Sequence, residues 1–431
     1  MMNLAPAADN LVASPDPLVA SPELTATAVL PTPFGSGRPM SAVERSKLLD
    51  RVYDEFCDLK AAGVDVDPEE FCARYPDLQV SLRKLFLAHN EVSDDLESVR
   101  QAARGWPQPG QDFLNYSLLS ELGRGTIARV FLARELNLGG RLVAVKLTLH
   151  DTNEPATLGK LQHPGVVPVY SARYDVASGF TIVVMPFLGG CTFCHVLDYL
   201  RVLPRRPDRA SVLLDAARDD RWSADGGPLP DAMLRRGGYL EGVLHIGAAM
   251  ADALASVHGQ GFLHRDLKPS NVLLTPYGRP VLLDFNLAHN QEVADYRLCG
   301  TLPYMPPEQL SATVAGRRPP EPPDARRDLF GLGVMLYELV AGVHPFGPVP
   351  LRLKSPEIRE YLLEQQQRGP KPMRKIDPTI DPELDRLLAR CLAWEPDVRP
   401  ASAAEFAAEL RRLLSPTRRL RRWAERHAQA L

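Results

Sequence analysis

Apolar residues recur at helical intervals over residues 41–104, ahead of the most apolar stretches of the chain. One amphipathic pattern covers 48–59 and a second covers 71–86, with Gly63 and Pro68 as breaks between them. Apolar positions three and four residues apart lie on one face of an α-helix. We therefore expect a small α-helical module over 41–104 that packs against the next part of the chain.

The two ends of the chain have a different composition from this module. Residues 1–40 are rich in Ala, Pro, Ser and Thr and contain almost no aromatic residue. Such a segment buries too little apolar surface to offset its ordering entropy, so disorder is predicted. Residues 415–431 form a basic tail with one aromatic residue. This tail predicts either a solvated helix end or a segment with weak contact to a membrane surface or a partner.

The main part of the chain, residues 115–414, changes from strand patterns to helical patterns. Short segments rich in apolar and β-branched residues lie between 115 and 187. Clear helical patterns come next at 244–258, 329–341 and 403–414. Strands first and helices afterwards predict an α+β fold with two lobes. The polar, Pro- and Gly-rich residues 201–238 predict a surface insertion.

Composition narrows the classes of function. The 431 residues are 45% hydrophobic and 24% charged with a net charge of −3, so no nucleic-acid partner is indicated. The N-terminus lacks the pattern of a signal peptide, and the longest apolar stretches are interrupted by charges such as Asp252 and Glu338. Six scattered cysteines fit a reducing compartment. We expect a cytoplasmic protein.

A glycine-rich turn between two strand patterns is the first candidate for binding chemistry. Gly123 and Gly125 form a Gly-x-Gly, and Ala128 stands where a third glycine would come. Glycine allows a backbone to fold closely over phosphate groups, although a plain hairpin turn has the same pattern. Lys146 ends an apolar strand after this turn. A lysine in such a place is usually only a solvated strand end, but behind a glycine-rich turn it is suited to bind phosphate groups.

The run His264-Arg265-Asp266-Leu267-Lys268-Pro269-Ser270-Asn271, followed by Asp284-Phe285-Asn286, is the most specific feature of the chain. With it, residues 115–414 resemble the eukaryotic-like serine/threonine protein kinases of bacteria. The resemblance implies a bilobal kinase fold and transfer of the γ-phosphate of ATP to Ser or Thr hydroxyls of protein substrates. The main alternative is a pseudokinase that binds nucleotide and acts as a scaffold. A small-molecule phosphotransferase is a third alternative, with less support.

The resemblance also implies roles for the residues of this run. Asp266 accepts the hydrogen bond of the substrate hydroxyl, and Lys268 neutralises the γ-phosphate. Asn271 and Asp284 supply the oxygen ligands that Mg²⁺ prefers. Lys146 orients the phosphates. The residues expected around the nucleotide are Leu122, Gly123, Gly125, Ala128, Val130, Ala144, Lys146, Pro186, Leu188 and Leu273, with Met185 as gatekeeper.

Residues 300–308 resemble the end of the kinase activation segment, which docks the peptide substrate. The family pattern implies that Thr301 ties Asp266 to Lys268. It also implies a buried ion pair between Glu308 and Arg399 and a bracing role for Asp328 beneath the catalytic loop.

Three departures from the family pattern concern control of the enzyme. Glu154 has the position of the glutamate that pairs with Lys146, but the helix carrying it is shortened. Asn286 replaces a glycine, and asparagine enters the left-handed region readily. Residues 287–299 contain no Ser or Thr. We therefore expect activity without threonine phosphorylation in this loop.

One motif suggests a different chemistry. Cys191, Cys194 and His195 match the C-x-x-C-H pattern of haem attachment. A pattern with three specified positions arises by chance, and haem attachment requires export. A zinc site would require a second Cys/His pair nearby. We expect neither haem nor zinc here.

Overall fold

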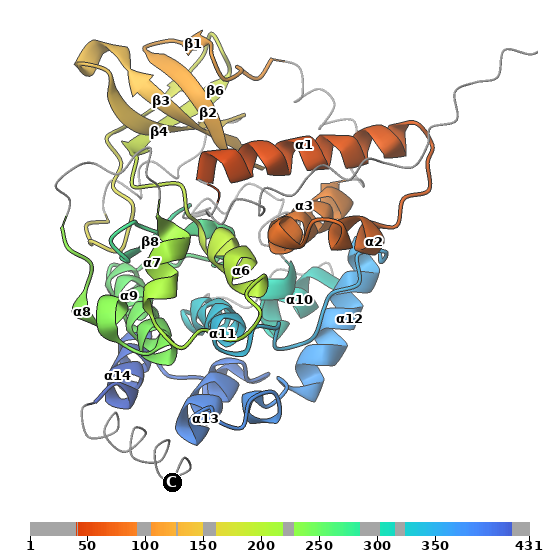
Figure 1. Ribbon diagram of the computed structural model, residues 1–431, viewed down its shortest axis with the longest axis vertical. Helices are drawn as coiled ribbons and strands as arrows, with labels where there is room; N and C mark the ends of the chain where they lie inside the picture. Colours follow the sequence, from red (N-terminus) through yellow and green to blue (C-terminus); the bar gives the residue numbers. More distant parts are fainter. Residues whose placement is uncertain are drawn as a thin grey trace, which may run out of the picture.

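The computed structural model describes residues 40, 42–92, 105–125, 128–149, 161–218, 228–284, 302–314 and 324–415. In Figure 1 a β-sheet lies at the top and a helical body lies beneath it, with an N-terminal group of helices beside both. The α+β, two-lobed fold expected from the sequence is confirmed.

The N-lobe is a six-stranded antiparallel sheet in the order β1-β2-β3-β4-β6-β5. Alternate residues of its strands, such as Val143, Val145 and Leu147, are fully buried, as expected for a sheet with one covered face. The strands are β1 (Asp112–Phe113), β2 (Tyr116–Arg124), β3 (Ala128–Glu135), β4 (Arg141–Thr148), β5 (Ser171–Asp175) and β6 (Phe180–Pro186), with the 3-10 turn η4 (Leu136–Leu138) between β3 and β4.

The C-lobe is helical and carries one small hairpin. Its apolar core gathers residues from most of these helices. The helices are α6 (Phe193–Arg201), α7 (Ser211–Ala217), α8 (Ala232–Arg236), α9 (Tyr239–Gly259), α10 (Pro307–Val314), α11 (Arg326–Ala341), α12 (Ser355–Arg368), α13 (Pro382–Cys391) and α14 (Ala403–Leu413). The hairpin joins β7 (Val272–Leu274) to β8 (Pro280–Leu282). Short 3-10 turns are η5 (Pro269–Asn271), η7 (Leu302–Tyr304), η8 (Met373–Lys375) and η9 (Pro396–Val398).

Helix α9 has the length and apolar composition of a membrane-crossing helix, but it packs inside the C-lobe. It contacts α11 and α14, and Ala251, Leu254 and Val257 along it are fully buried. Its hydrophobicity is therefore explained by burial in the protein core.

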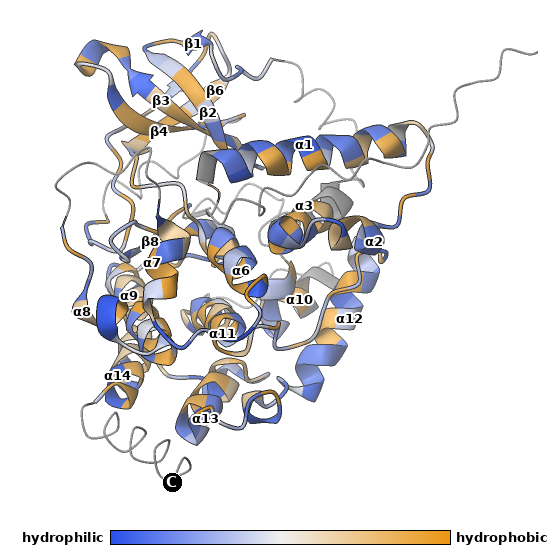
Figure 2. Cartoon of the chain, in the orientation of Figure 1, coloured by the Kyte–Doolittle hydropathy of each residue, from blue (hydrophilic) through white to orange (hydrophobic). Residues whose placement is uncertain are grey.

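The N-terminal module consists of α1 (Ala42–Ala61), α2 (Pro68–Ala73), the 3-10 turn η2 (Pro76–Leu78) and α3 (Gln79–Val92). Apolar and polar positions alternate around α1 in Figure 2, as the sequence pattern predicts. Phe56, Phe71 and Phe86 form an aromatic cluster at its centre, with ring centroids 4.2–6.0 Å apart. Of the helical module predicted at 41–104, the structure shows helices within residues 42–92.

Two sequence-based boundaries need correction. Trp106, which lies outside both the predicted module at 41–104 and the predicted main part at 115–414, is buried in the N-lobe core, where its ring lies 4.8 Å from that of Phe180. Residues 201–238 do not form a purely superficial insertion, because Leu213 on α7 and Leu234 on α8 are buried in the C-lobe core. Isolated apolar residues in a polar, Pro-rich stretch gave no periodic signal from which this burial could be predicted.

Candidate active site

Asp328 of α11 is a buried carboxylate that fixes the loop 264–268, between α9 and η5, through hydrogen bonds. The backbone N–H groups of His264 and Arg265 each donate to Asp328 at 2.8 Å, and His258 Nε2 lies 2.8 Å from the same carboxylate. Burial opposes ionisation of Asp328, but His258 and the other hydrogen bonds outweigh it and lower its pKa. The bracing role expected for Asp328 is confirmed. It stabilises a backbone in which Arg265 has a φ of 65°.

Asp266 lies on this loop with its side chain almost fully buried. Lys268 Nζ is 2.7 Å from Asp266 Oδ2. Asn271 Nδ2 donates to the Asp266 carbonyl at 2.8 Å and to Oδ2 at 3.1 Å. The three residues that the sequence assigned to hydroxyl, phosphate and metal therefore form one hydrogen-bonded group.

A second charged pair connects the two lobes. Lys146 Nζ on β4 lies 2.8 Å from Asp284 Oδ1, just after β8. Burial opposes ionisation of Asp284, but Lys146 and, more weakly, Lys268 outweigh it and lower its pKa. Asp284 is thus a carboxylate at neutral pH, as a Mg²⁺ ligand must be. Its φ of 48° shows that its backbone is held in a conformation rare for residues other than glycine.

Asn271 and Asp284 fit the chemistry of a magnesium site. Because Asn271 Nδ2 donates to Asp266, its side-chain oxygen is the group left for a cation. Within the part of the chain that the structure describes, no group of three His, Cys, Asp or Glu side chains could hold a metal by itself. Mg²⁺ usually keeps waters and substrate phosphate oxygens beside one or two protein ligands, which suits this pair.

Four of the residues expected at the nucleotide lie in or against one apolar cluster at the junction of the lobes. Buried Met185 and Leu273 belong to it, and Ala144 and Leu188 pack against them. Pro186 pairs with Val143 in the sheet, so β6 ends directly beside this cluster. The cluster offers an apolar site next to Lys146, the lysine expected to orient phosphate groups.

The glycine-rich turn lies at the end of the β2–β3 hairpin. Gly125 N–H donates to the Ala128 carbonyl at 2.8 Å, and Gly123 is paired with Val130. Val130 is in turn paired with Lys146 on β4, so the turn and the lysine are neighbours in the sheet. The open space at the Gly123 Cβ position permits close approach of a ligand to the backbone.

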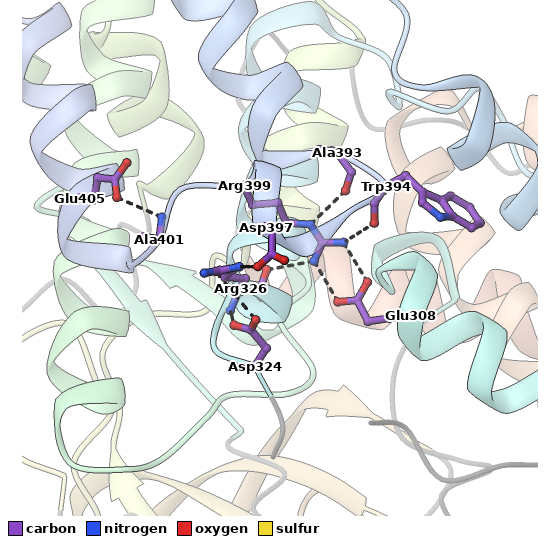
Figure 3. Close-up of polar contacts among 9 residues, drawn as sticks. All are labelled: Glu308, Asp324, Arg326, Ala393, Trp394, Asp397, Arg399, Ala401 and Glu405. Carbon is purple, nitrogen blue, oxygen red and sulfur yellow. Dashed lines mark hydrogen bonds and ion pairs between the residues drawn. The ribbon is translucent and has the colours of Figure 1, made fainter. Parts of the chain in front are cut away.

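The ion pair predicted between Glu308 and Arg399 is confirmed. Arg399 Nη1 and Nη2 contact the two Glu308 oxygens at 2.9 and 2.8 Å. The fully buried guanidinium also donates to the carbonyls of Ala393, Trp394 and Arg326, as Figure 3 shows. The network therefore joins the start of α10 to the rest of the C-lobe.

Several predictions fall outside the described residues: the Lys146–Glu154 pair, the left-handed Asn286, the absence of a phosphorylated residue in 287–299, the role of Thr301 and most of the basic tail. They remain predictions.

The Cys191–His195 motif begins helix α6. Thr192 N–H donates to His195 Nδ1 at 3.1 Å, and Cys191 Sγ lies 3.3 Å from the Ala216 carbonyl. Burial lowers the pKa of His195 to about 3, so the ring is neutral. The motif is accounted for by the start of a helix packed in the C-lobe.

Comparisons with known proteins agree with this geometry. Residues 116–410 match the protein kinase domain family. The DNA damage-responsive serine/threonine-protein kinase RqkA of Deinococcus radiodurans is 32% identical over 68% of this chain and 38% of its own length. The serine/threonine-protein kinase PknB of Mycolicibacterium smegmatis is 29% identical over 69% and 43%. The tyrosine-protein kinase MasK of Myxococcus xanthus is 29% identical over 71% and 44%.

The fold and the assembled residues are those of the protein kinase class. The chain belongs to the protein kinase domain family. These matches span less than half the length of each of the three relatives.

Sequence reasoning missed the buried polar residues that join the module to the kinase domain. Asp198 of α6 is completely buried, and Ser81 of α3 hydrogen-bonds to it. The available signal was a lone aspartate within the amphipathic pattern of α6, which by itself indicates only a solvated position.

Proposed function

We propose that the protein is a serine/threonine protein kinase that transfers the γ-phosphate of ATP, bound with Mg²⁺, to a hydroxyl of a protein substrate. The observation that carries this proposal is the group Asp266–Lys268–Asn271, with Lys146 and Asp284 paired beside it. A protein kinase requires little covalent chemistry from its residues, because positioning and charge neutralisation supply most of the catalysis.

Each residue has a role that follows from its contacts. Asp266 orients the hydroxyl and accepts its proton, and Lys268 brings a positive charge next to that carboxylate. Asn271 and Asp284 would hold Mg²⁺, which neutralises phosphate charge when bound. Lys146 keeps Asp284 ionised and is placed to orient phosphate groups beside the glycine-rich turn.

Lys268 supports serine/threonine specificity over tyrosine specificity, since the lysine in this position is typical of the serine/threonine kinases that the chain resembles. The relatives RqkA and PknB are named serine/threonine-protein kinases, whereas MasK is named a tyrosine-protein kinase. The acceptor residue therefore needs a direct measurement.

The test is incubation of the full chain with Mg²⁺, γ-labelled ATP and myelin basic protein, followed by phosphoamino-acid analysis. We expect label on serine and threonine, and a loss of about 10³-fold in Asp266→Asn. Label on tyrosine would contradict the proposed specificity. If neither protein transfers phosphate while both bind ATP, the chain is a nucleotide-binding scaffold.

A further inference from the structure

The N-terminal module packs on the face of the C-lobe that carries residues 302–305, close to the catalytic loop. Asp266, Tyr304, Met305 and Gln309 line the pocket beside the catalytic loop. Met305 also belongs to the apolar core of the module, together with Leu302, Leu310 and residues of the helices α1 to α3. Met305 thus contacts both the small cavity beside the catalytic loop and the apolar core of the module. In Figure 1 the module lies beside both lobes, with α2 and α3 above α10 and α12.

The first contact between the module and the kinase domain is polar and fully buried. Asp198 of α6 accepts hydrogen bonds from Val80 N–H at 2.7 Å and from the Ser81 hydroxyl. Arg45 of α1 lies 4.0 Å from the same carboxylate. Both groups of the Ser81–Asp198 pair are buried, so a second negative charge introduced there would have no solvent to screen it.

The second contact reaches the segment that ends the activation loop. The Lys84 ammonium lies 5.1 Å from the centroid of the Tyr304 ring and 3.3 Å from Cys194 Sγ. Tyr304 itself donates a hydrogen bond to Glu338 at 2.7 Å. The module therefore contacts residues 302–305 through both its apolar core and a cation.

The third contact joins α2 and α3 to the chain that precedes α12. Glu69 accepts a hydrogen bond from Leu351 N–H at 3.0 Å, and Arg83 donates to the Val349 carbonyl. Val349, Leu351 and the α12 residues Ile358 and Leu362 share the apolar core of the module. The module thus extends from α6 across residues 302–305 to α12.

The fourth contact lies on the other lobe. Ser46 of α1 donates to the Glu121 carbonyl on β2 at 3.2 Å, and Asp54 is 3.8 Å from Arg124 in the glycine-rich turn. Helix α1 therefore bridges the two lobes on the same side as the contacts of α3 with the C-lobe.

From these four contacts we infer that residues 42–92 form an intramolecular cap, which occupies the place of a protein substrate and must leave before such a substrate is phosphorylated. The inference rests on the proposed kinase activity. A serine that reaches Asp266 brings its neighbouring residues against the segment 302–306, which the sequence assigns to peptide docking. Leu302 and Met305 of that segment are buried in the apolar cluster that they share with the module and with α12. A folded substrate and the module therefore compete for one surface.

ATP binding is not expected to compete with the module. The apolar site beside Lys146 is made by Met185, Leu273 and their neighbours, a cluster separate from that of the module. Release of the module should therefore act mainly on the kcat/KM for protein, and the contacts of α1 with Glu121 and Arg124 at the glycine-rich turn allow only a smaller change in the KM for ATP.

The test uses the full chain with one substitution that breaks the buried contact. Ser81→Asp places a carboxylate against Asp198, and Lys84→Glu, on a different residue, reverses the charge beside the Tyr304 ring. Ala73→Asp adds the same charge as Ser81→Asp at an exposed position of the module and is the matched control. In Ser81→Asp/Asp198→Asn the repulsion is removed and docking should return.

Release is measured independently of activity, by hydrogen exchange of residues 302–314 and of α3. Activity is measured with myelin basic protein and Mg²⁺-ATP. We expect faster exchange and a kcat/KM for the protein substrate raised roughly tenfold or more in Ser81→Asp and Lys84→Glu. Ala73→Asp should behave as the wild type.

Faster exchange with an equal or lower rate of protein phosphorylation would overturn the proposal that the module is a cap. The module would then have no effect on the catalytic site or would stabilise it. Unchanged exchange in both variants would overturn it too, since these contacts would not hold the module. If neither the wild type nor any variant transfers phosphate, even when exchange shows that the module is released, the proposed kinase activity is refuted. The proposal of a cap is then refuted with it. Equal rates before and after release would refute the cap alone.

Discussion

Lys146 on β4 and Asp284 after β8 form an ion pair of 2.8 Å that joins the two lobes at the centre of the site. The Lys146 side chain is only 8% exposed, so its charge acts in a poorly solvated environment. The pair holds the proposed metal ligand ionised and places the phosphate-orienting cation beside it.

Lys146→Met should remove this cation while keeping the length of the side chain. We expect kcat for phosphate transfer to fall by about 10²–10³-fold, because a preorganised charge on the phosphates is lost. The measurement is single-turnover transfer from labelled ATP. Lys146→Arg keeps the charge and should retain more activity than Lys146→Met, and equal losses in both variants would contradict an electrostatic role.

Asn271→Ala should free the Asp266 carboxylate from one of its donors and remove the proposed metal ligand. We expect the activity to fall roughly tenfold or more and the Mg²⁺ concentration for half-maximal rate to rise. A titration of the rate with Mg²⁺ at fixed ATP measures both. Asn115→Ala, the same substitution at an exposed position of the N-lobe, is the control. An unchanged Mg²⁺ dependence in Asn271→Ala would exclude Asn271 as a ligand.

Glu308→Gln should destabilise the C-lobe, because it leaves the fully buried guanidinium of Arg399 without its counter-charge. The expected loss in free energy of unfolding is about 3 kcal/mol. Asp397→Ala removes an ion pair with Arg326 whose aspartate side chain is 95% exposed, and it should cost less than about 1 kcal/mol. Urea denaturation of both variants compares them. Equal losses in the free energy of unfolding in the two variants would show that burial does not determine how much each ion pair contributes to stability.

Docking of the module should strengthen as the pH falls towards the pKa of Asp198. Burial raises the pKa of Asp198 from 3.8 to about 6, although Arg45, Ser81, Val80 N–H and Lys84 act in the opposite direction. A raised pKa means that the docked state binds the proton more tightly. The stability associated with this group is therefore complete below about pH 4 and is lost as the pH rises through about 6.

Asp198→Asn resembles the protonated residue and should remove this pH dependence. The difference in unfolding free energy between wild type and variant should change by up to about 3 kcal/mol between pH 4 and 7. Chemical denaturation across this range measures it, with Ala73→Asp as a control that retains the wild-type slope. A constant difference between wild type and Asp198→Asn would contradict the assignment.

Much of the site could be predicted from the sequence, because its chemistry depends on residue types at short, specific spacings. The run from His264 to Asn271 lies in one loop, so its members are close together in any fold that forms the loop. The ion pair of Glu308 and Arg399, 91 residues apart, was predicted from the family pattern and not from local spacing.

The sequence by itself determined the two-lobed α+β class and the helical module, and it supplied the residues that we propose for phosphate transfer. Hydrophobic periodicity reports which face of a helix is buried, and catalytic motifs report chemistry. Only the tertiary structure decided where the module lies. Periodicity does not specify the partner of an apolar face, and the buried Asp198 is recognisable only when Val80 and Ser81 are seen against it. Long-range packing thus placed the module against α6, residues 302–305 and the chain before α12, whereas the sequence predicted only that it packs against the following part of the chain.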